Sequence, residues 1–236
     1  MSNPLRLGVA GLGVVGTSLV QLLQRQHAGL AKRVGRGLAV TAFSARRKDD
    51  RGVDLGGAAY FASAAELAAS GDIDIFVELI GGAEGVAFDA VKAALSRGTS
   101  VVTANKAMLA AHGFELATLA EQSGAQLFFE AAVGGGIPVI KTLRESLAGN
   151  AIQRVSGILN GTCNYILSRM EIEHLPFEIC LKEAQRLGYA EADPTFDVGG
   201  FDTAHKLAIL ASLAFGAKID AGAVSVEGIE TITLAD

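Results

Sequence analysis

Apolar runs of strand length alternate, through the first half of the chain, with segments whose apolar residues recur every three or four positions. The runs that predict buried strands are Leu5–Ala10, Ala39–Phe43, Ile73–Ile80, Thr99–Thr103 and Ala125–Phe129. Helical stripes lie within Val15–Leu23 and Ala87–Leu95, and the glycine- and charge-rich stretches 29–37 and 46–57 are predicted to be loops. Continuous apolar strands that alternate with helices predict an α/β protein with a parallel sheet covered on both faces.

The pattern changes at Gly134-Gly135-Gly136-Ile137-Pro138, where a glycine run precedes a helix that carries proline in its first turn. We place a domain boundary between residues 135 and 136. Beyond it the sequence predicts helices over Pro138–Leu147, Thr162–Glu171, Pro176–Leu187 and Asp202–Phe215, and a strand over Ala151–Ile158. One or two strands are too few for an independent sheet, so this second domain is expected to be incomplete.

Composition and charge exclude several classes of partner. The chain has 236 residues, of which 50% are hydrophobic, and its 20 basic residues are scattered among 25 acidic ones. Neither nucleic acid nor an anionic membrane surface is therefore expected as a partner. The uncharged stretch Ala131–Ile140 contains three glycines and a proline and is about half the length needed to cross a bilayer.

Two cysteines, Cys163 and Cys180, are the only ones in the sequence. The apolar start of the chain lacks the charged segment and cleavage site of a signal peptide and is interpreted as a buried strand. We therefore expect reduced thiols and a cytoplasmic protein. The histidines lack neighbouring metal ligands, so a zinc site is not expected.

A glycine motif, Gly11-Leu12-Gly13-Val14-Val15-Gly16, directly follows the first predicted strand. In such a motif the first glycine permits a tight turn, the second lets the backbone approach a pyrophosphate, and the third lets the next helix pack closely. The motif alone is equally compatible with a structural turn, but its place between a strand and a helix favours a dinucleotide at the helix N-terminus. We predict a Rossmann-type doubly wound parallel sheet over residues 1–135 that binds NAD(P), followed by an incomplete α+β substrate and dimerisation domain over 136–236.

Arginines stand where the ribose of the cofactor is expected. An acidic residue commonly follows the second strand and binds the 2′-hydroxyl, but here Arg46 and Arg47 follow it. A guanidinium fork suits a 2′-phosphate, so NADP(H) is predicted in preference to NAD(H). Two alternatives remain open: the arginines solvate a loop, or Asp49 or Asp50 binds the ribose.

Two lysines occupy positions that suit a polar site. Thr103 and Lys106 lie at the end of a predicted parallel strand, where open α/β sheets bind their ligands. Asp202 and Lys206 are spaced i, i+4 and share a helix face. From spacing alone, a solvated lysine and a surface ion pair are the commoner explanations of these features.

Several long motifs together resemble homoserine dehydrogenases. The segment Ala184–Lys206 resembles the signature of that family, with Gly188, Asp193-Pro194, Asp197, Gly200, Asp202 and Lys206 all in place. The resemblance continues, in order along the chain, through Gly11–Gly16, Val77–Gly82, Thr103–Lys106, Phe129–Pro138 and Leu159–Tyr165. It implies an oxidoreductase that reversibly reduces L-aspartate 4-semialdehyde to L-homoserine with NAD(P)H, in the biosynthesis of threonine, methionine and isoleucine.

The resemblance also implies roles for particular side chains. The catalytic residues would be Lys206, as proton donor, and Lys106. Substrate would be bound by Glu191 and Asp202, which suit its ammonium group, and by Asp197, which equally suits a turn cap. The cofactor would be bound by Gly11, Leu12, Gly13, Val14, Val15, Gly16, Arg46, Arg47, Thr103, Lys106 and Gly188.

A monovalent cation is a further implication of the resemblance. Its ligands would come from Glu130, Val133, Gly135 and Ile137, and the ion would be a structural Na⁺ or K⁺ held by oxygen atoms. The alternative is that Gly134–Gly136 is only a hinge between the domains.

The sequence departs from the family in length, since homoserine dehydrogenases continue beyond the signature helix. We expect this chain to be a truncated part of a longer protein that forms a homodimer through its substrate domain. Two other functions stay open: an NADP-dependent reductase of another small amino-acid aldehyde or keto acid, and an NADP-binding fragment without turnover.

Overall fold

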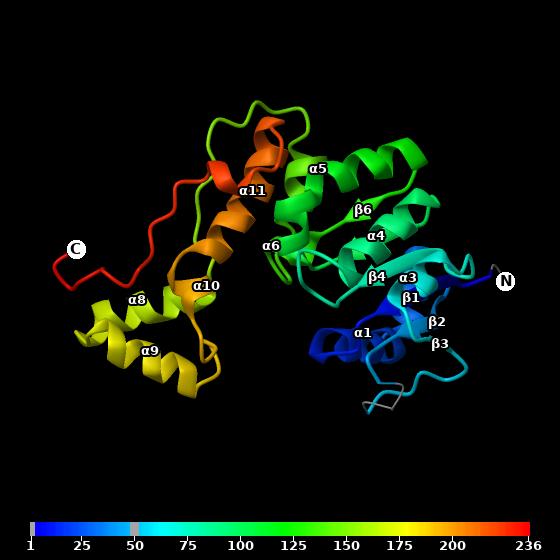
Figure 1. Cartoon of the computed structure of the whole chain (residues 1–236), viewed down its shortest axis with the longest axis horizontal. Coiled ribbons are helices and arrows are strands. Elements are labelled where there is room, and N and C mark those ends of the chain that lie inside the picture. Colours follow the sequence, from blue (N-terminus) through cyan, green and yellow to red (C-terminus); the bar gives the residue numbers. More distant parts are fainter. Residues whose placement is uncertain (1–2, 48–51) are drawn as a thin grey trace. The chain divides into compact units, whose positions relative to one another are not determined.

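The chain divides into two compact units, one ending at Pro138 and the other running from Val139 to Asp236 (Figure 1). A computed structural model describes residues 3–47 and 52–236. The boundary predicted between residues 135 and 136 lies just before this division. Each unit has its own core and is described separately.

The first unit is built on a six-stranded sheet whose pairings are all parallel. Its strands are β1 (Leu5–Ala10), β2 (Leu38–Ser44), β3 (Ala59–Phe61), β4 (Ile75–Glu78), β5 (Ser100–Thr103) and β6 (Leu127–Phe128). They lie in the order β3-β2-β1-β4-β5-β6. Strands β2 and β3 are therefore added on one side of β1 and strands β4 to β6 on the other, so the strand order reverses between β1 and β4. This order confirms the predicted doubly wound parallel sheet, and such sheets bind ligands at the carboxyl ends of the strands beside the reversal.

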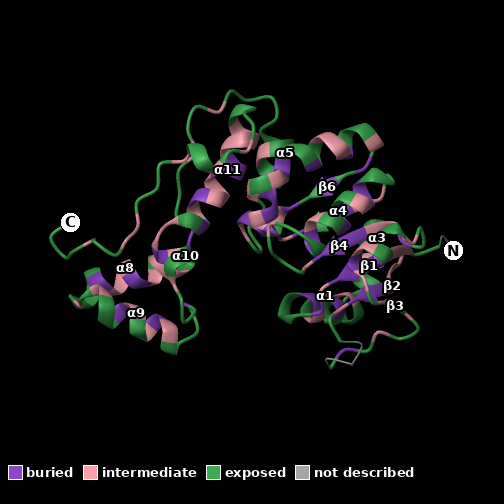
Figure 2. Cartoon of the chain, in the orientation of Figure 1, coloured by how far each residue is buried: buried purple, intermediate pink, exposed green. Residues whose placement is uncertain are grey.

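Helices connect most of the strands of this sheet, and one short helix follows the last strand. The helices are α1 (Val14–Arg25), α2 (His27–Val34), α3 (Ala64–Ala69), α4 (Val86–Ser96), α5 (Lys106–Ser123) and α6 (Glu130–Val133). Helix α4 packs against both α3 and α5, and α1 packs against α2. Right-handed crossovers place these two groups on opposite faces of the sheet. The strands between them are the most buried part of the unit, with Val9, Phe76 and Val101 fully covered (Figure 2).

Some predictions in this unit are wrong. The predicted loop at 29–37 is largely helix α2, which ends at Gly35 with φ 81°. No residue of α2 is buried, and its eight residues include a glycine and two basic residues, which is why the sequence favours a loop there. Strand β3 and helix α3 were also not predicted, because both are too short for a periodic pattern.

The second unit is helical. Its elements are α7 (Val139–Lys141), the π-helical turn η1 (Thr142–Ser146), α8 (Gly161–Glu173), α9 (Phe177–Arg186), α10 (Thr195–Val198), α11 (Phe201–Phe215) and the 3-10 turn η2 (Ala221–Ala223). Its core cluster includes Ile166 and Met170 of α8, Cys180 of α9 and Val198 of α10. The helices predicted from the sequence are therefore present, the first as α7 and η1. None of the described helices is both long and apolar enough to cross a bilayer.

The predicted strand Ala151–Ile158 is wrong. Residues 151–160 have no regular structure, and Ile158 is 78% exposed. The described part of this unit contains no strand that could pair with the segment, and an isolated strand leaves its backbone groups unpaired. The second unit is thus helical over its described residues, where an α+β domain was expected.

Candidate functional site

The glycine motif forms the turn between β1 and α1. Gly11 has φ 100°, and a Cβ atom there would lie 2.4 Å from the carbonyl oxygen of Leu79. A Cβ atom on Gly16 would lie 2.0 Å from the carbonyl oxygen of Gly11, whereas one on Gly13 would meet nothing within 4 Å. The first and third glycines are therefore required by close packing. The second leaves open space at the N-terminus of α1, where a phosphate can approach the backbone amides.

A small cavity of about 170 Å³ opens beside this turn. It is lined by Val15, Glu78, Leu79, Ile80, Gly81, Ala104 and Asn105. These residues come from the start of α1 and from the carboxyl ends of β4 and β5, next to the reversal of strand order. Val14 and Val15, in the first turn of α1, are 85% and 60% exposed, so apolar surface borders the same edge of the sheet.

A buried carboxylate organises the floor of this cavity. Glu78 is fully buried at the end of β4, and its Oε1 accepts hydrogen bonds from the amides of Ile80 at 2.7 Å and Gly81 at 3.0 Å. Its Oε2 accepts a hydrogen bond of 2.5 Å from the hydroxyl of Thr103 on β5. Glu78 therefore fixes both the loop after its own strand and the side chain at the end of the next strand.

Asn105 continues this network into α5. Its backbone amide donates to Thr103 Oγ1 at 3.0 Å, and its side-chain amide donates to the carbonyl of Gly82 at 2.7 Å. Its Oδ1 accepts from the amide of Met108 at 3.1 Å and caps the helix. Lys106 is the next residue, half-buried in the first turn of α5, so its backbone position is fixed by this network.

The arginines predicted to bind a 2′-phosphate follow β2 directly. Arg46 and Arg47 are both exposed, and the carbonyl of the preceding Ala45 accepts a 3.4 Å hydrogen bond from Tyr60. Their guanidinium groups are thus accessible at the carboxyl end of the strand. The alternative ribose ligands Asp49 and Asp50 lie outside the described residues.

The second unit brings Asp197, Asp202 and Lys206 together. Lys206 Nζ donates to Asp202 Oδ2 at 2.7 Å and to the carbonyl oxygen of Leu159 at 2.8 Å. The carboxamide of Asn160 donates to Asp197 Oδ1 at 2.7 Å and to Asp202 Oδ2 at 2.9 Å. The Asp202 side chain is 3% exposed and that of Lys206 is 17% exposed, so this i, i+4 pair joins a buried carboxylate to a partly buried lysine and is not the solvated surface ion pair that spacing alone allowed.

Gly188 and Glu191 lie in the loop after α9. Gly188 has φ 79°, its amide donates to Gln185 O at 3.0 Å, and the amide of Tyr189 donates to Ala184 O at 2.9 Å. These two bonds form a Schellman motif, which explains the glycine. The side-chain amide of Gln185 then donates to Glu191 O at 3.0 Å, and the Glu191 side chain is exposed. The loop backbone is held while the carboxylate stays accessible.

Cys163 adjoins the carboxylate cluster. Its thiol donates to the carbonyl of Asp197 at 3.2 Å. Burial, followed by the negative charges of Asp197 and Asp202, raises the pKa of the Cys163 thiol to about 11. The thiol is therefore protonated at neutral pH and is not a nucleophile there.

The predicted cation ligands lie in and after α6. The amide of Gly134 donates to Glu130 O at 3.1 Å, and the amide of Ile137 donates to Gly134 O at 3.2 Å, which folds this segment into a compact turn. The oxygen atoms in this turn that could ligate a cation are those of backbone carbonyls and one carboxylate, and oxygen ligands suit a hard monovalent cation. Over residues 3–47 and 52–236, no group of three or more His, Cys, Asp or Glu side chains is arranged for a metal ion.

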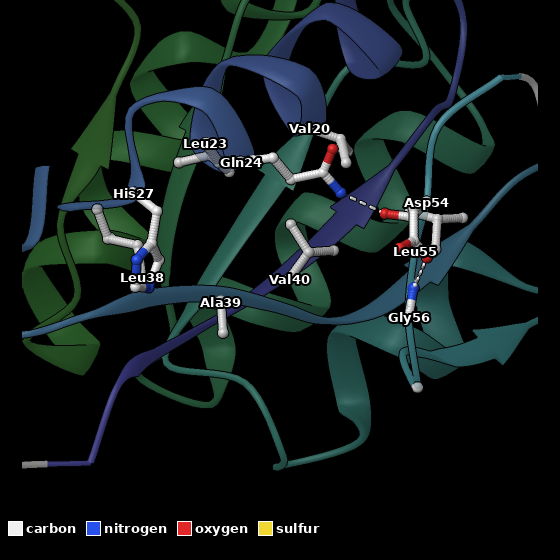
Figure 3. A pocket seen from close by; sticks show the side chains of 11 residues that line it. Val20, Leu23, Gln24, His27, Leu38, Ala39, Val40, Asp54, Leu55 and Gly56 are labelled. Carbon is white, nitrogen blue, oxygen red and sulfur yellow. Dashed lines mark hydrogen bonds between the residues drawn. The ribbon is translucent and has the colours of Figure 1, made fainter. Parts of the chain in front are cut away.

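Another hollow, of about 280 Å³, lies between α1, α2, β2 and residues 54–57 (Figure 3). The side-chain amide of Gln24 donates to Asp54 O across it, and Gly56 N donates to Asp54 Oδ1 at 2.7 Å. Much of its lining is aliphatic, including Leu23 and Val40. None of the predicted site residues lines it, so we do not assign it a role in the reaction.

Three buried polar residues at these sites have no role predicted from the sequence: Glu78, Asn105 and Asn160. Glu78 carries a signal in the sequence, because it is a carboxylate at the end of an otherwise apolar strand. The two asparagines each precede a helix, which is a common capping position. Their bonds to distant groups, from Asn105 to the Gly82 carbonyl and from Asn160 to the Asp197 and Asp202 carboxylates, have no local signal.

Two family models match the chain. The model described as "Homoserine dehydrogenase, NAD binding domain" matches residues 11–130, and the model described as "Homoserine dehydrogenase" matches residues 138–236. Together they cover both compact units.

Individual relatives are similar over nearly the whole chain. The homoserine dehydrogenase of Pseudomonas aeruginosa is 47% identical over 234 residues, which are 99% of this chain and 54% of that protein. The crystal structure of a homoserine dehydrogenase from Thiobacillus denitrificans has a TM-score of 0.93 and 44% identity, covering 99% of this chain and 54% of that one. A hyperthermophilic archaeal homoserine dehydrogenase in complex with NADPH has a TM-score of 0.84 and 28% identity, covering 99% and 76%. This chain spans about half the length of the curated relatives it matches.

Proposed function

The chain belongs to the homoserine dehydrogenase family, and from that premise we propose that it supplies the cofactor and substrate sites for the reversible, NAD(P)H-dependent reduction of L-aspartate 4-semialdehyde to L-homoserine. This reaction serves the biosynthesis of threonine, methionine and isoleucine. The observation that carries the proposal is the bond between the partly buried Lys206 ammonium and the buried Asp202 carboxylate, which lies next to a second carboxylate on the same asparagine bridge.

Lys206 is proposed as the proton donor. When bound, the nicotinamide supplies the hydride that reduces the aldehyde carbon. The oxygen of the aldehyde then needs a proton, which an ammonium group in hydrogen-bond reach can provide. Two N–H groups of Lys206 donate to protein oxygens among the described residues, and the third suits the substrate oxygen. Lys106 is proposed as the second catalytic lysine.

The carboxylates are proposed to bind the amino group of the substrate. Both L-aspartate 4-semialdehyde and L-homoserine carry an ammonium group, which pairs well with carboxylate oxygens. Glu191 is exposed on a loop whose backbone is held by Gln185, and Asp202 is buried beside Lys206. The Asn160 carboxamide donates to both Asp197 and Asp202, and Asp197 is proposed to help hold these side chains in place.

The cofactor is proposed to be NADP(H) in preference to NAD(H). The glycine turn and α1 would hold the pyrophosphate through backbone amides, as the clearance at Gly13 supports. Arg46 and Arg47 are exposed at the end of β2 and would bind a 2′-phosphate. The remaining contacts are proposed from the predicted cofactor residues Leu12, Val14, Val15, Thr103, Lys106 and Gly188.

A structural Na⁺ or K⁺ is proposed at the turn after α6. The carbonyl-rich turn supports oxygen ligands from Glu130, Val133, Gly135 and Ile137. The ion would fix this turn and take no part in proton or hydride transfer. Its presence can be checked by measuring the thermal midpoint in Na⁺, K⁺ and a bulky organic cation, which should be lower in the last of these.

We propose that the full-length protein forms a homodimer through its second unit. Exposed aliphatic side chains of the second unit support an interface there, among them Ile158, Ile172 and Ile179 at 78%, 76% and 51% exposure. Light scattering coupled to size-exclusion chromatography measures the assembly directly, and a monomer at micromolar concentration would contradict this proposal.

The reaction is tested by oxidation of L-homoserine with NADP at alkaline pH, where release of a proton favours the oxidised product. The near-ultraviolet absorbance of reduced nicotinamide should rise, and the rise should vanish in Lys206→Ala while NADPH still binds. A panel of other small hydroxy amino acids tests the alternative substrates, and faster turnover of one of them would replace homoserine. NADPH binding without any turnover would instead identify a cofactor-binding segment.

A further inference from the structure

Asn160 makes three side-chain hydrogen bonds at the start of α8. Its Oδ1 accepts from the amide of Cys163 at 2.8 Å, which is a helix N-cap. Its Nδ2 donates one hydrogen to Asp197 Oδ1 at 2.7 Å and the other to Asp202 Oδ2 at 2.9 Å. The residue is 6% exposed, so these bonds form away from bulk water.

The same segment also holds Lys206. The carbonyl oxygen that accepts from Lys206 Nζ at 2.8 Å belongs to Leu159, the residue immediately before Asn160. Asp202 Oδ2 therefore receives hydrogen bonds from both Lys206 and the Asn160 carboxamide. Two adjacent residues thus hold the ion pair. Leu159 binds the lysine through its carbonyl oxygen, and Asn160 binds the carboxylate through its side chain.

We propose that Asn160 is a positioning residue of the reaction, whose carboxamide holds Asp202 in place and so sets the position of the Lys206 ammonium. This inference rests on the proposed function of Lys206 and adds a residue to which no role has been assigned. Asn160 acts through these two side chains, and no contact of its own with the substrate is required.

The chemistry of the carboxamide explains why this residue suits the position. An asparagine side chain offers one acceptor and two N–H donors, and all three are used here. An aspartate would keep the cap but add a third negative charge beside two carboxylates. A serine would keep the cap and lose both bridges, because its hydroxyl is shorter and carries one hydrogen.

Burial explains why the bridge affects Lys206. Asp202 is 2% exposed, and a buried carboxylate needs its hydrogen bonds. Without the Asn160 donor, Asp202 Oδ2 loses one of its two charge-assisted hydrogen bonds, and the bond from Lys206 fixes the position of the carboxylate less tightly. The ammonium would follow its counter-ion, and its bond to the Leu159 carbonyl would weaken.

The first test observes the Lys206 ammonium directly, by ¹H–¹⁵N NMR of lysine side chains at low temperature and mildly acidic pH. The signal of Lys206 is identified by its absence in Lys206→Arg. In the wild-type protein we expect slow hydrogen exchange, and in Asn160→Ser and Asn160→Asp we expect loss of the signal through faster exchange. The control Cys163→Ala keeps the Asn160 bridges and should keep the signal. A signal that persists in Asn160→Ser, or that is unprotected in the wild type, would overturn the inference.

Turnover provides the second test. Asn160→Ser should lower kcat by about 100-fold, the order expected from a misplaced catalytic group, with unchanged NADPH affinity when assayed well below its thermal midpoint. A residue that only caps α8 would leave kcat intact in this variant. If the wild-type protein binds NADPH and does not oxidise homoserine, the proposed function has failed, and the NMR comparison still decides the role of Asn160.

A double variant with the net charge of the wild type separates loss of the bond from Asn160 to Asp202 from the effect of an added negative charge. Asn160→Asp combined with Asp197→Asn has the same net charge as the wild type and can still form one amide–carboxylate bond between positions 160 and 197. It leaves Asp202 without its amide donor. We expect kcat to stay low, and recovery of kcat to the wild-type value would overturn the assignment of Asn160 to Asp202.

Discussion

The hydroxyl of Thr103 donates a hydrogen bond to the carboxylate of Glu78 across the carboxyl ends of two neighbouring strands. The register of β4 and β5 pairs these two residues directly, and both side chains are almost completely buried. The bond joins the floor of the cavity beside the glycine turn to the capped start of α5. It therefore links the sheet to the backbone that carries Lys106.

Thr103→Val is expected to destabilise the first unit by about 2 kcal/mol. Valine has the same shape but can neither donate to the buried Glu78 carboxylate nor accept from the Asn105 amide, and the bond to the charged group alone contributes about 1.5–3 kcal/mol. Urea denaturation measures this loss. Thr103→Ser keeps the hydroxyl and is the matched control. Equal loss in both variants would mean that the methyl group matters and the bond does not.

The glycines of the turn should respond differently to alanine. Gly16→Ala places a Cβ atom 2.0 Å from a backbone carbonyl and is expected to cost about 3 kcal/mol of stability or more. Gly13→Ala meets open space, so stability should hardly change while NADPH binding weakens by at least an order of magnitude, since a side chain then blocks the pyrophosphate. Thermal unfolding and fluorescence titration of both variants check this. Normal NADPH affinity in Gly13→Ala would place the phosphates elsewhere.

The sheet could be predicted from the sequence because its strands are buried on both faces and therefore form continuous apolar runs. Helix α1 was found for a similar reason, since its apolar stripe lies between two such runs. Helix α2 buries no residue and strand β3 is only three residues long, so neither gives a clear periodic pattern. Burial alone does not decide the outcome, because α5 buries Met108 and Leu116 and was not predicted either.

The polar sites, like the elements, could be predicted only in part. Asp202 and Lys206 are one helical turn apart, so their pairing could be expected from spacing. The bonds from Asn160 to Asp197 and Asp202 join residues 37 and 42 positions apart and depend on how α8, α10 and α11 pack. Burial of the Asp202–Lys206 pair also depends on that packing, which no local pattern specifies.

Arg46→Asp should weaken the binding of NADPH much more than the binding of NADH. A charge-assisted bond to a 2′-phosphate contributes about 1.5–3 kcal/mol, which corresponds to about a 10- to 100-fold change in Kd. NADH has no such phosphate and should lose little. Isothermal titration with both cofactors measures the ratio, and Arg25→Asp, at the far end of α1, serves as a charge control. Equal loss for the two cofactors would remove Arg46 from the phosphate site.

Asp74→Asn should destabilise the protein at neutral pH and have little effect in acid. Hydrogen bonds from the Arg6 side chain, then from its backbone amide, lower the pKa of the Asp74 carboxyl below its ordinary value of 3.8. A lowered folded-state pKa contributes stability above the unfolded pKa, and this is lost as pH falls through the folded value. The effect should be modest because both side chains are partly exposed. Urea midpoints of the two proteins should differ at neutral pH and converge as the pH falls through the lowered folded-state pKa of Asp74. A constant difference across this range would contradict the assignment.

Cys163 should react slowly with thiol reagents at neutral pH although it is only half-buried. Burial and the charges of Asp197 and Asp202 raise the pKa of its thiol from 9.0 to about 11, which lowers the thiolate fraction about 100-fold. Alkylation followed by mass spectrometry resolves Cys163 from Cys180, and the rate at Cys163 should keep rising up to about pH 11. Asp197→Asn removes one of the two nearby charges and should lower the pKa of the thiol and speed alkylation. A rate at neutral pH equal to that of free cysteine would mean that the carboxylate cluster does not hold Cys163 as described, and the contact between its thiol and the Asp197 carbonyl would then be in doubt as well.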